Sequence, residues 1–272
     1  MSYSPLCHAK AANDVWCVDF KGQFRMGNNR YCYPLTITDA HSRMLLTCEG
    51  LDNTRGCGAQ QGFQEAFRRY GLPDAIRSDN GTPFASTGLA GLSQLSVWWL
   101  RLGIRLERIE PASPQQNGRH ERMHRTLKAE TTRPAGANML QQQERFDRFQ
   151  ELYNNTRPHE SLGQRPPAEF YQPSARRLPA QIPEPEYPLH DLSVRVRPSG
   201  HIYIPGSGRK TGASFLSSAL AGERVGVREL DDHRWLVSFM DQDLATLNLE
   251  TGKILPLEPF KPQTTLVPAP EG

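Results

Sequence analysis

The 272-residue sequence contains no run of 18 or more apolar residues, so no segment is predicted to span a membrane as a helix. Its first ten residues, MSYSPLCHAK, lack the apolar stretch of a secretory signal. Its five cysteines form no C-x-x-C pair, which favours reduced thiols over disulfides or a zinc site. We therefore expect a cytoplasmic protein.

Charge of one sign is not in large excess. The sequence has 32 Lys and Arg against 29 Asp and Glu, a formal net charge of +3, and this total alone does not indicate a polyanionic partner. Hydrophobic residues make up 37% of the chain and charged residues 22%, so most of it should be globular. The length allows one large domain or two modest ones.

The first half of the chain alternates between strand and helix patterns. Alternating apolar residues predict strands at 15–22, 30–39 and 42–51, joined by short turns into an antiparallel meander. The next predicted elements are a helix at 59–70, a strand at 74–78, a helix at 89–102, a strand at 104–109, a helix from Arg119 to Pro134 and a helix at 138–154. The apolar stripe of this last helix is predicted to be Leu140, Phe146, Phe149, Leu152 and Tyr153. This order implies an α/β domain with a mixed sheet covered by helices.

The second half has a different composition. The predicted organisation is a lead-in at 1–13, a core at 14–155, a Pro-rich linker at 156–190, short strands at 191–258 and a disordered tail at 259–272. About five strands in under 70 residues, separated by Gly, Pro and Asp-Asp turns, predict a small β-barrel.

Three acidic residues lie at positions that suggest a function. Asp19 lies within the first strand, where a charge is costly unless a cation or an open face is present. Asp79 follows the strand at 74–78, at the kind of strand end where α/β sheets bind ligands. Glu121 lies in a helix with Met123 and Leu127 on the other side. Taken alone, the three could be a paired buried acid, a turn residue and an ion-pair partner.

Carboxylates on a central strand, a neighbouring strand end and a covering helix can converge. Hard divalent cations prefer such oxygen ligands, and Mg²⁺ keeps waters that substrate phosphates replace. Two cations about 3.5–4 Å apart can hold the attacking and leaving oxygens of a phosphoryl displacement. Together, the three acids favour metal-dependent phosphoryl transfer over the three separate alternatives.

Four stretches carry a resemblance. WCVDFKG contains Asp19, IRSDNGTPF contains Asp79, SPQQNGRHERMHRTLK contains Glu121, and YNNTRPHESLGQRPPAEFY occupies 153–171. In this order they resemble the integrase catalytic core of bacterial insertion-sequence transposases and retroviral integrases, over about residues 13–172. Asp19 and Asp79 are 60 positions apart, and 41 residues separate Asp79 from Glu121. That second gap is longer than the 35 residues of the usual family label.

The resemblance implies a DDE enzyme with a ribonuclease H-like mixed five-stranded sheet, followed by a small C-terminal β-barrel. Asp19, Asp79 and Glu121 would hold Mg²⁺ or Mn²⁺. The enzyme would hydrolyse a phosphodiester at a transposon end, and the freed 3′-hydroxyl would then attack a target strand. The implied partners are double-stranded DNA, both transposon ends and target, and further copies of the chain.

Basic and amide residues around the third acid are candidate DNA contacts. Between positions 101 and 128, seven Lys and Arg stand against three acids. The predicted phosphate contacts are Arg119, Arg122, Arg125 and Lys128. Gln115, Gln116 and Asn117 are predicted either to reach bases and sugars or to form a plain turn. Arg101, Arg105 and Arg108 are predicted to serve solubility only.

Other residues have open interpretations. Arg157 and His159 could contact DNA, but bracing of the core is favoured. His120 and His124 could support the metal ligands or contact phosphates. Arg195, Arg197, Arg209 and Lys210 cluster around the Gly-rich hairpin HIYIPGSGRKTG, although 191–258 as a whole holds eight basic and nine acidic residues. This hairpin is interpreted equally as a DNA-facing loop or as a soluble turn in a protein-contact module.

One departure from the family pattern is notable. Such proteins normally carry helix-turn-helix domains before the core, and here about a dozen residues precede the first strand. We therefore expect this chain to lack its own N-terminal DNA-recognition domain. Two alternatives to an active transposase remain: a non-catalytic, truncated DNA-binding or regulatory remnant, and a ribonuclease H-like nuclease.

Overall fold

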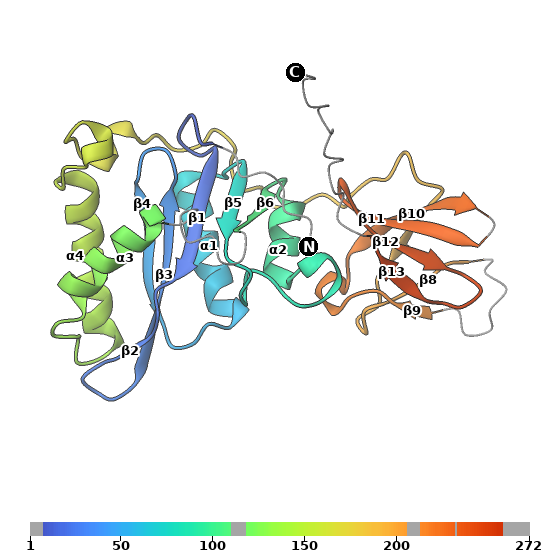
Figure 1. Cartoon of the computed structure of the whole chain (residues 1–272), viewed down its shortest axis with the longest axis horizontal. Helices are drawn as coiled ribbons and strands as arrows, with labels where there is room; N and C mark the ends of the chain where they lie inside the picture. Colours follow the sequence, from blue (N-terminus) through green and yellow to red (C-terminus); the bar gives the residue numbers. More distant parts are fainter. Residues whose placement is uncertain (1–7, 110–117, 206–212, 232, 258–272) are drawn as a thin grey trace, which may run out of the picture.

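The computed structural model describes residues 8–109, 118–205, 213–231 and 233–257. The predicted tail at 259–272 lies outside these residues. Figure 1 shows two bodies side by side: an α/β body made by the first part of the chain and a β body made by its last part. None of the helices in the described ranges combines the length and apolar character needed to cross a bilayer.

A mixed sheet forms the centre of the α/β body. Its strands are β1 (Val15–Phe20), β2 (Phe24–Arg25), β3 (Tyr31–Asp39), β4 (Leu45–Leu51), β5 (Ala75–Ser78) and β6 (Arg105–Arg108). Five of them follow the order β4-β3-β1-β5-β6, and the short β2 pairs with the start of β3. β1 is antiparallel to β3 and parallel to β5, which is parallel to β6. The predicted antiparallel meander and mixed five-stranded sheet are thus confirmed.

Helices cover both faces of this sheet, as Figure 1 shows. The α-helices are α1 (Gly56–Tyr70), α2 (Gln94–Arg101), α3 (Gly118–Thr131) and α4 (Met139–Asn155). On one face, Phe63 and Phe67 of α1 and Trp99 of α2 pack in one apolar cluster with Trp16 of β1. A second cluster joins α3 and α4 to β3 and β4, through residues such as Met123, Leu127, Phe146, Phe149 and Cys48. Strand β3 is therefore buried from both sides, since Leu35 and Ile37 belong to the first cluster and Cys32 to the second.

The helix predicted at 89–102 is shorter than expected. A 3₁₀ turn occupies Leu89–Gly91, where Ala90 and Gly91 have φ values of 53° and 68°, and α2 begins only at Gln94. This left-handed backbone cannot continue a right-handed helix. Ser93 then starts α2 through a reciprocal capping box with Ser96. The apolar pattern was continuous across the break, so it gave no sign of it.

The apolar stripe predicted for α4 is wrong at two positions. Leu140 and Leu152 are exposed, with relative areas of 71% and 45%, whereas Phe146, Phe149 and Tyr153 are buried. The buried face includes Gln142 instead, whose side chain donates to the Thr131 carbonyl at 3.1 Å and accepts from the Gly136 amide at 2.8 Å. A buried glutamine with both ends satisfied replaces a leucine at the end of the stripe.

The β body contains an open antiparallel sheet. Its order is β13-β12-β11-β10-β7, and a separate hairpin pairs β8 with β9. The strands are β7 (Leu192–Arg195), β8 (His201–Tyr203), β9 (Ala213–Phe215), β10 (Arg224–Asp231), β11 (Arg234–Phe239), β12 (Gln242–Asn248) and β13 (Ile254–Pro256). Among the described strands the pairing stops at β7 on one edge and β13 on the other. The short strands were predicted correctly, but their closure into a barrel is not shown.

The segment between the two bodies is extended and held by the core. Residues 160–162 and 167–170 form 3₁₀ turns. Further on, the Arg176 side chain donates to the carbonyls of Pro73, Leu102 and Gly103 at 2.7–3.0 Å. The Leu72 amide donates to the Arg176 carbonyl at 2.7 Å. Arg176 thus fixes this extended segment, which we call the strap, to two loops of the α/β body.

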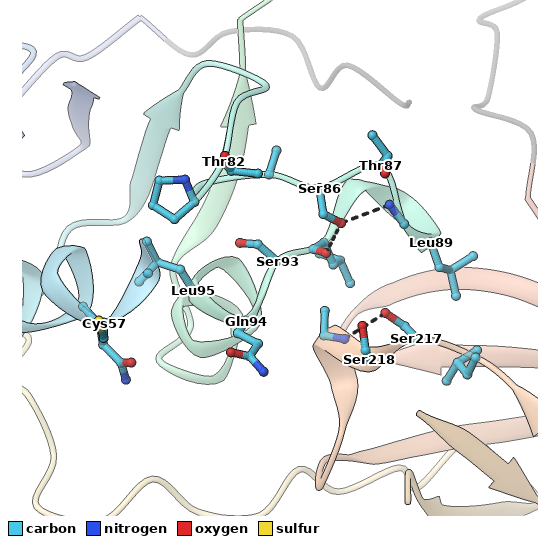
Figure 2. A pocket seen from close by; sticks show the side chains of 18 of the residues that line it. Cys57, Thr82, Ser86, Thr87, Leu89, Ser93, Gln94, Leu95, Ser217 and Ser218 are labelled. Carbon is cyan, nitrogen blue, oxygen red and sulfur yellow. Dashed lines mark hydrogen bonds between the residues drawn. The ribbon is translucent and has the colours of Figure 1, made fainter. Parts of the chain in front are cut away.

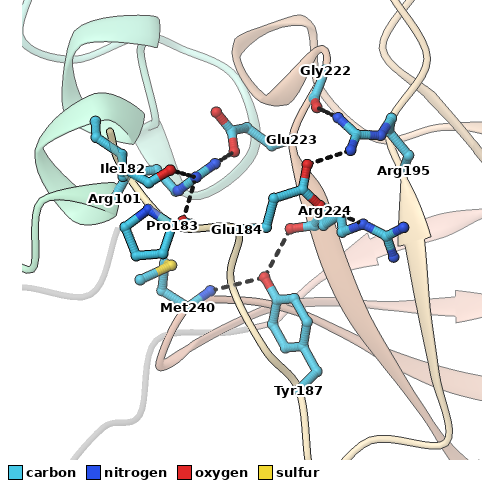
Figure 3. A network of polar contacts seen from close by, with 10 residues as sticks. All are labelled: Arg101, Ile182, Pro183, Glu184, Tyr187, Arg195, Gly222, Glu223, Arg224 and Met240. Atoms are coloured by element: carbon cyan, nitrogen blue, oxygen red, sulfur yellow. Dashed lines mark hydrogen bonds and ion pairs between the residues drawn. The ribbon is translucent and has the colours of Figure 1, made fainter. Parts of the chain in front are cut away.

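A second set of polar contacts fixes the junction itself (Figure 3). Arg101 of α2 pairs with Glu223 and donates to the Pro183 carbonyl at 2.7 Å. Glu184 pairs with Arg195 and with Arg224 of the β body. Because Arg101 reaches both the strap and the β body, it ties three parts of the chain together.

Apolar contacts reinforce this junction. Leu92, Val97 and Leu100 of the α2 region belong to the apolar core of the β body, together with Leu220 and Val225. Figure 2 shows the pocket next to this contact, between the loop around Ser86 and the residues Ser217 and Ser218. The Ser86 hydroxyl donates to the Leu92 carbonyl and accepts from the Gly88 amide, which shapes one wall of the pocket.

Candidate active site

The first acid, Asp19, lies on the central strand of the α/β body. It pairs in register with Thr36 of β3, and the Thr36 hydroxyl donates to the Asp19 carbonyl at 3.2 Å. The Asp19 side chain is only 23% exposed. Strand β3 pairs with the backbone at Asp19, and β5 pairs with β1 only up to Cys17, so the position of the Asp19 backbone is fixed from the β3 side.

The second acid, Asp79, follows β5, whose last residue is Ser78. Its carboxylate is exposed and accepts a hydrogen bond from the Gly81 amide at 3.0 Å. A Cβ atom at Gly81 would lie 3.1 Å from Asp79 Oδ2, so the absence of a side chain at this position lets the carboxylate lie close to the backbone of the turn. The Asn80 side chain donates to the Ile109 carbonyl at 2.8 Å, which ties the turn to the end of β6.

The third acid, Glu121, lies in the first turn of α3 and is exposed. Met123 and Leu127 are buried beneath the same helix, as predicted. Their packing against the sheet sets the rotation of α3 about its axis. That rotation leaves the polar face of the helix, with Glu121, directed away from the apolar cluster.

Electrostatics links the three acids. Burial and, after it, the charges of Asp79 and Glu121 raise the pKa of the Asp19 carboxyl to about 7, against the lowering effects of the Phe20 amide and Lys21. The two other carboxylates therefore lie within electrostatic reach of Asp19. Asp19 and Glu121 also line one cleft, whereas Asp79 stands at the end of the neighbouring strand β5.

A cleft beside Asp19 has a mixed lining. Its residues are Asp19, Phe20, Lys21, Glu121, His124, Arg125, Lys128, Ala129 and Arg133. Arg125 and Lys128 were predicted to hold phosphates. Lys21 and Arg133 were missed by the sequence reasoning, although Lys21 stands two residues after Asp19. Asp79 does not line this cleft.

The other predicted DNA contacts are placed differently. Gln115, Gln116 and Asn117 lie outside the described residues, and so does the side chain of Arg119. Arg122 is exposed on α3 and does not line the cleft. Arg157 pairs with Glu130 at the end of α3 and lies 5.9 Å from the ring centroid of Phe149. This position fits the favoured interpretation of Arg157 as a brace between helices.

Two of the arginines assigned to solubility have structural contacts instead. Arg101 holds the junction described above. Arg108 donates to the Ser78 hydroxyl and to the Phe84 carbonyl, each at 2.7 Å. Burial lowers the pKa of Arg108 to about 10, against the opposing charge of Asp79. The expectation for these two residues is therefore wrong.

Two histidines lie behind Asp19. His120 and His124 of α3 are buried, and both bond to the Thr36 hydroxyl, at 2.8 and 2.6 Å from their Nε2 atoms. Burial lowers the pKa of His120 to about 3. Burial, together with the charges of His120 and Lys21, holds the pKa of His124 well below its ordinary value. Both imidazoles are therefore neutral at pH 7.

The donor set fits a divalent cation. It offers the partly buried carboxylate of Asp19, two more carboxylates that repel it, and a neutral imidazole beside it. Carboxylate oxygens are the ligands of Mg²⁺ and Mn²⁺, and imidazole nitrogen is accepted by several transition metals.

The strand order β4-β3-β1-β5-β6, with an acid on the central strand, defines a ribonuclease H-like α/β fold. Two family models, both described as integrase core domain, match residues 9–114 and 102–167. The chain thus contains an integrase core domain, related to insertion-element proteins and retroviral integrases.

Individual relatives agree with this assignment. An uncharacterized 39.2 kDa protein of insertion element IS476 from Xanthomonas euvesicatoria is 28% identical over 159 residues, which are 58% of this chain and 44% of the relative. The chain thus spans less than half of that relative's length.

Two solved structures are similar to this chain in fold or in part of it. The intasome of simian T-cell lymphotropic virus, in complex with a PP2A regulatory subunit, contains a chain that matches with a TM-score of 0.52 and 18% identity, over 97% of this chain and 84% of that one. The integrase catalytic core domain of HTLV-2, in complex with magnesium, matches with a TM-score of 0.48 and 14% identity, over 61% of this chain and 100% of that one.

Proposed function

We propose that this chain is a transposase or integrase that cleaves and joins DNA strands with the help of Mg²⁺ or Mn²⁺ held by Asp19, Asp79 and Glu121. The observation that carries this proposal is the cleft that Asp19 and Glu121 line together with the basic residues Lys21, Arg125, Lys128 and Arg133. Membership of the integrase core family supports it, since that family's members are typically polynucleotidyl transferases.

The residues around the cleft have roles that follow from their charge. When bound, the cation would activate a water or a 3′-hydroxyl and stabilise the charge on the attacked phosphate. Arg125, Lys128 and Arg133 would hold phosphates of the DNA backbone next to the acids. Lys21 lines the same cleft as Asp19 and would contact the phosphate backbone of the DNA strand that is cleaved or joined. Two DNA ends and a target would need more than one copy of the chain.

A strand-transfer assay tests the proposal. The substrates are a duplex with a recessed 3′-hydroxyl end from the element that carries the gene and a supercoiled plasmid target, with Mn²⁺. Joined products are expected from the wild type and should vanish with Asp79→Asn and Glu121→Gln. Asp52→Asn is the matched control, because Asp52 is an exposed acid in a loop that does not line the cleft.

The alternatives make different predictions in the same assay. DNA binding without nicking or joining at any Mn²⁺ concentration would contradict the proposal and favour a regulatory remnant. Cleavage confined to RNA–DNA hybrids would favour a ribonuclease H-like nuclease.

A further inference from the structure

Behind Asp19 lies a buried cluster of two histidines and two threonines, which we call the His–Thr cluster: Thr36, Thr38, His120 and His124. Thr36 Oγ1 is the centre of the cluster, at 2.8 Å from His120 Nε2 and 2.6 Å from His124 Nε2. Thr38 Oγ1 lies 3.1 Å from His120 Nδ1. All four residues are less than 9% exposed. The contacts of this cluster determine which nitrogen atoms carry protons.

Proton positions follow from the hydrogen-bonding capacity of Thr36. A hydroxyl has one proton, and Thr36 donates it to the Asp19 carbonyl at 3.2 Å. With that proton assigned to the carbonyl, the oxygen accepts, and we assign the protons of both His120 and His124 to their Nε2 atoms, which then donate to it. His120 Nδ1 is then unprotonated and accepts from the Thr38 hydroxyl. Both nitrogens of His120 are thereby used.

His124 differs from His120 at its second nitrogen. Its Nδ1 carries a lone pair in this arrangement and lies 3.7 Å from Asp19 Oδ2. That separation is longer than a hydrogen bond. A lone pair facing a carboxylate oxygen is unfavourable unless something positive lies between them.

A shared cation satisfies both atoms. Ligand atoms of Asp19, His120 and His124 lie within 4.8 Å of one another, and His120 is excluded from ligation by its two hydrogen bonds. Metal–nitrogen and metal–oxygen bonds are each about 2.1 Å long, so two of them can span a gap of this size. The Thr36 contact fixes the orientation of the His124 ring, as partners of ligating histidines commonly do.

We propose that His124 Nδ1 is a ligand of the cation held by Asp19, so that the site uses one nitrogen atom besides carboxylate oxygens. This inference rests on the proposed function, because it needs a cation at Asp19. Its consequence is a stronger preference for Mn²⁺ and other cations that accept imidazole over Mg²⁺ than an all-carboxylate site would have.

Pulsed electron paramagnetic resonance of Mn²⁺ bound to the full chain tests this assignment. The wild type should show modulation from a directly bound imidazole nitrogen, and labelling the histidines with ¹⁵N should change it. His124→Gln should abolish the nitrogen coupling and weaken Mn²⁺ binding roughly tenfold, with a smaller effect on Mg²⁺. His120→Gln is the matched control, since this neighbour from the same cluster should leave the coupling in place.

The outcomes separate the two proposals. Mn²⁺ binding that is unaffected by Asp19→Asn would overturn both the proposed function and the His124 ligand. Binding that depends on Asp19 but shows no nitrogen coupling in the wild type would overturn the His124 ligand alone, whether or not any histidine variant folds. Coupling that disappears in His120→Gln and persists in His124→Gln would also overturn it.

Discussion

Arg108 donates a 2.7 Å hydrogen bond to the hydroxyl of Ser78, the residue immediately before Asp79. Its other terminal nitrogen donates to the Phe84 carbonyl at the far side of the same turn. The turn that carries Asp79 is therefore held by a half-buried arginine from the neighbouring strand β6. Because two partners share one planar guanidinium, lysine cannot replace it.

Arg108→Lys is accordingly expected to loosen the turn that carries Asp79. The Ser78 hydroxyl and the Phe84 carbonyl would share at most one ammonium group, so we expect a loss of about 1–3 kcal/mol in the free energy of unfolding. Strand transfer should fall more than DNA binding does. Urea unfolding and the joining assay measure the two effects, with Arg228→Lys at an exposed position of β10 as the control. Equal stability of the two variants would contradict the assigned contacts.

Asp19→Asn is expected to stabilise the metal-free protein at pH 8. The folded-state pKa of Asp19 is raised from 3.8 to about 7, so the folded chain holds this proton more tightly than the unfolded chain does. The carboxylate therefore costs stability as pH rises from about 4 to 7, by about 4 kcal/mol at most. Urea unfolding in the presence of a chelator should give Asp19→Asn a higher free energy of unfolding than the wild type at pH 8, and an equal one at pH 4. Asp52→Asn should show no such difference.

Buried His120 is expected to sensitise the fold to acid. Its pKa falls from 6.5 to about 3 in the folded chain, so the unfolded chain binds the proton first. The contribution of neutral His120 to the free energy of unfolding is fully present above pH 6.5. It is lost as pH falls toward 3, by up to about 1.4 kcal/mol per pH unit for one group. His120→Gln should flatten the dependence of unfolding free energy on pH between 6 and 4. His233→Gln, at an exposed side chain, is the control, and an unchanged slope for His120→Gln would be the contrary result.

Arg101→Met is expected to loosen the junction between the two bodies. Arg101 and Glu223 have side chains only 13% and 23% exposed, so removing one partner leaves a poorly solvated charge. We expect a loss on the order of 2 kcal/mol and faster proteolysis in the strap at 171–190. Limited proteolysis followed by mass spectrometry measures this. Arg68→Met breaks an exposed pair with Glu65 and should leave the strap resistant.

The sequence predicted the sheet and the acids because both leave local signals. Alternating apolar residues marked β1, β3 and β4, and Asp19, Asp79 and Glu121 lay in recognisable motifs. The His–Thr cluster left no such signal, because Thr36 and His124 are 88 positions apart and meet only through the packing of α3. Arg108 was misjudged for a similar reason, since its partners belong to another strand and a loop.

Two other differences between expectation and structure, the open sheet of the β body and the break before α2, have another origin. Strand patterns specify which residues pair, but the meeting of β7 and β13 depends on sheet curvature and on the hairpin β8–β9. The break before α2 depended on the left-handed backbone of Ala90, a residue that rarely adopts it. Neither feature is visible in hydrophobic alternation.

The apolar residues shared across the junction determine where the chain can be cut. Leu92, Val97 and Leu100 are buried in the same cluster as Val225 and Leu220 of the β body. In a fragment that ends at residue 190, these side chains would form an exposed apolar patch on the surface. Such a fragment would self-associate through α2, whereas one that extends to 257 would stay dispersed. The α/β body therefore needs the C-terminal sheet to cover its own apolar surface.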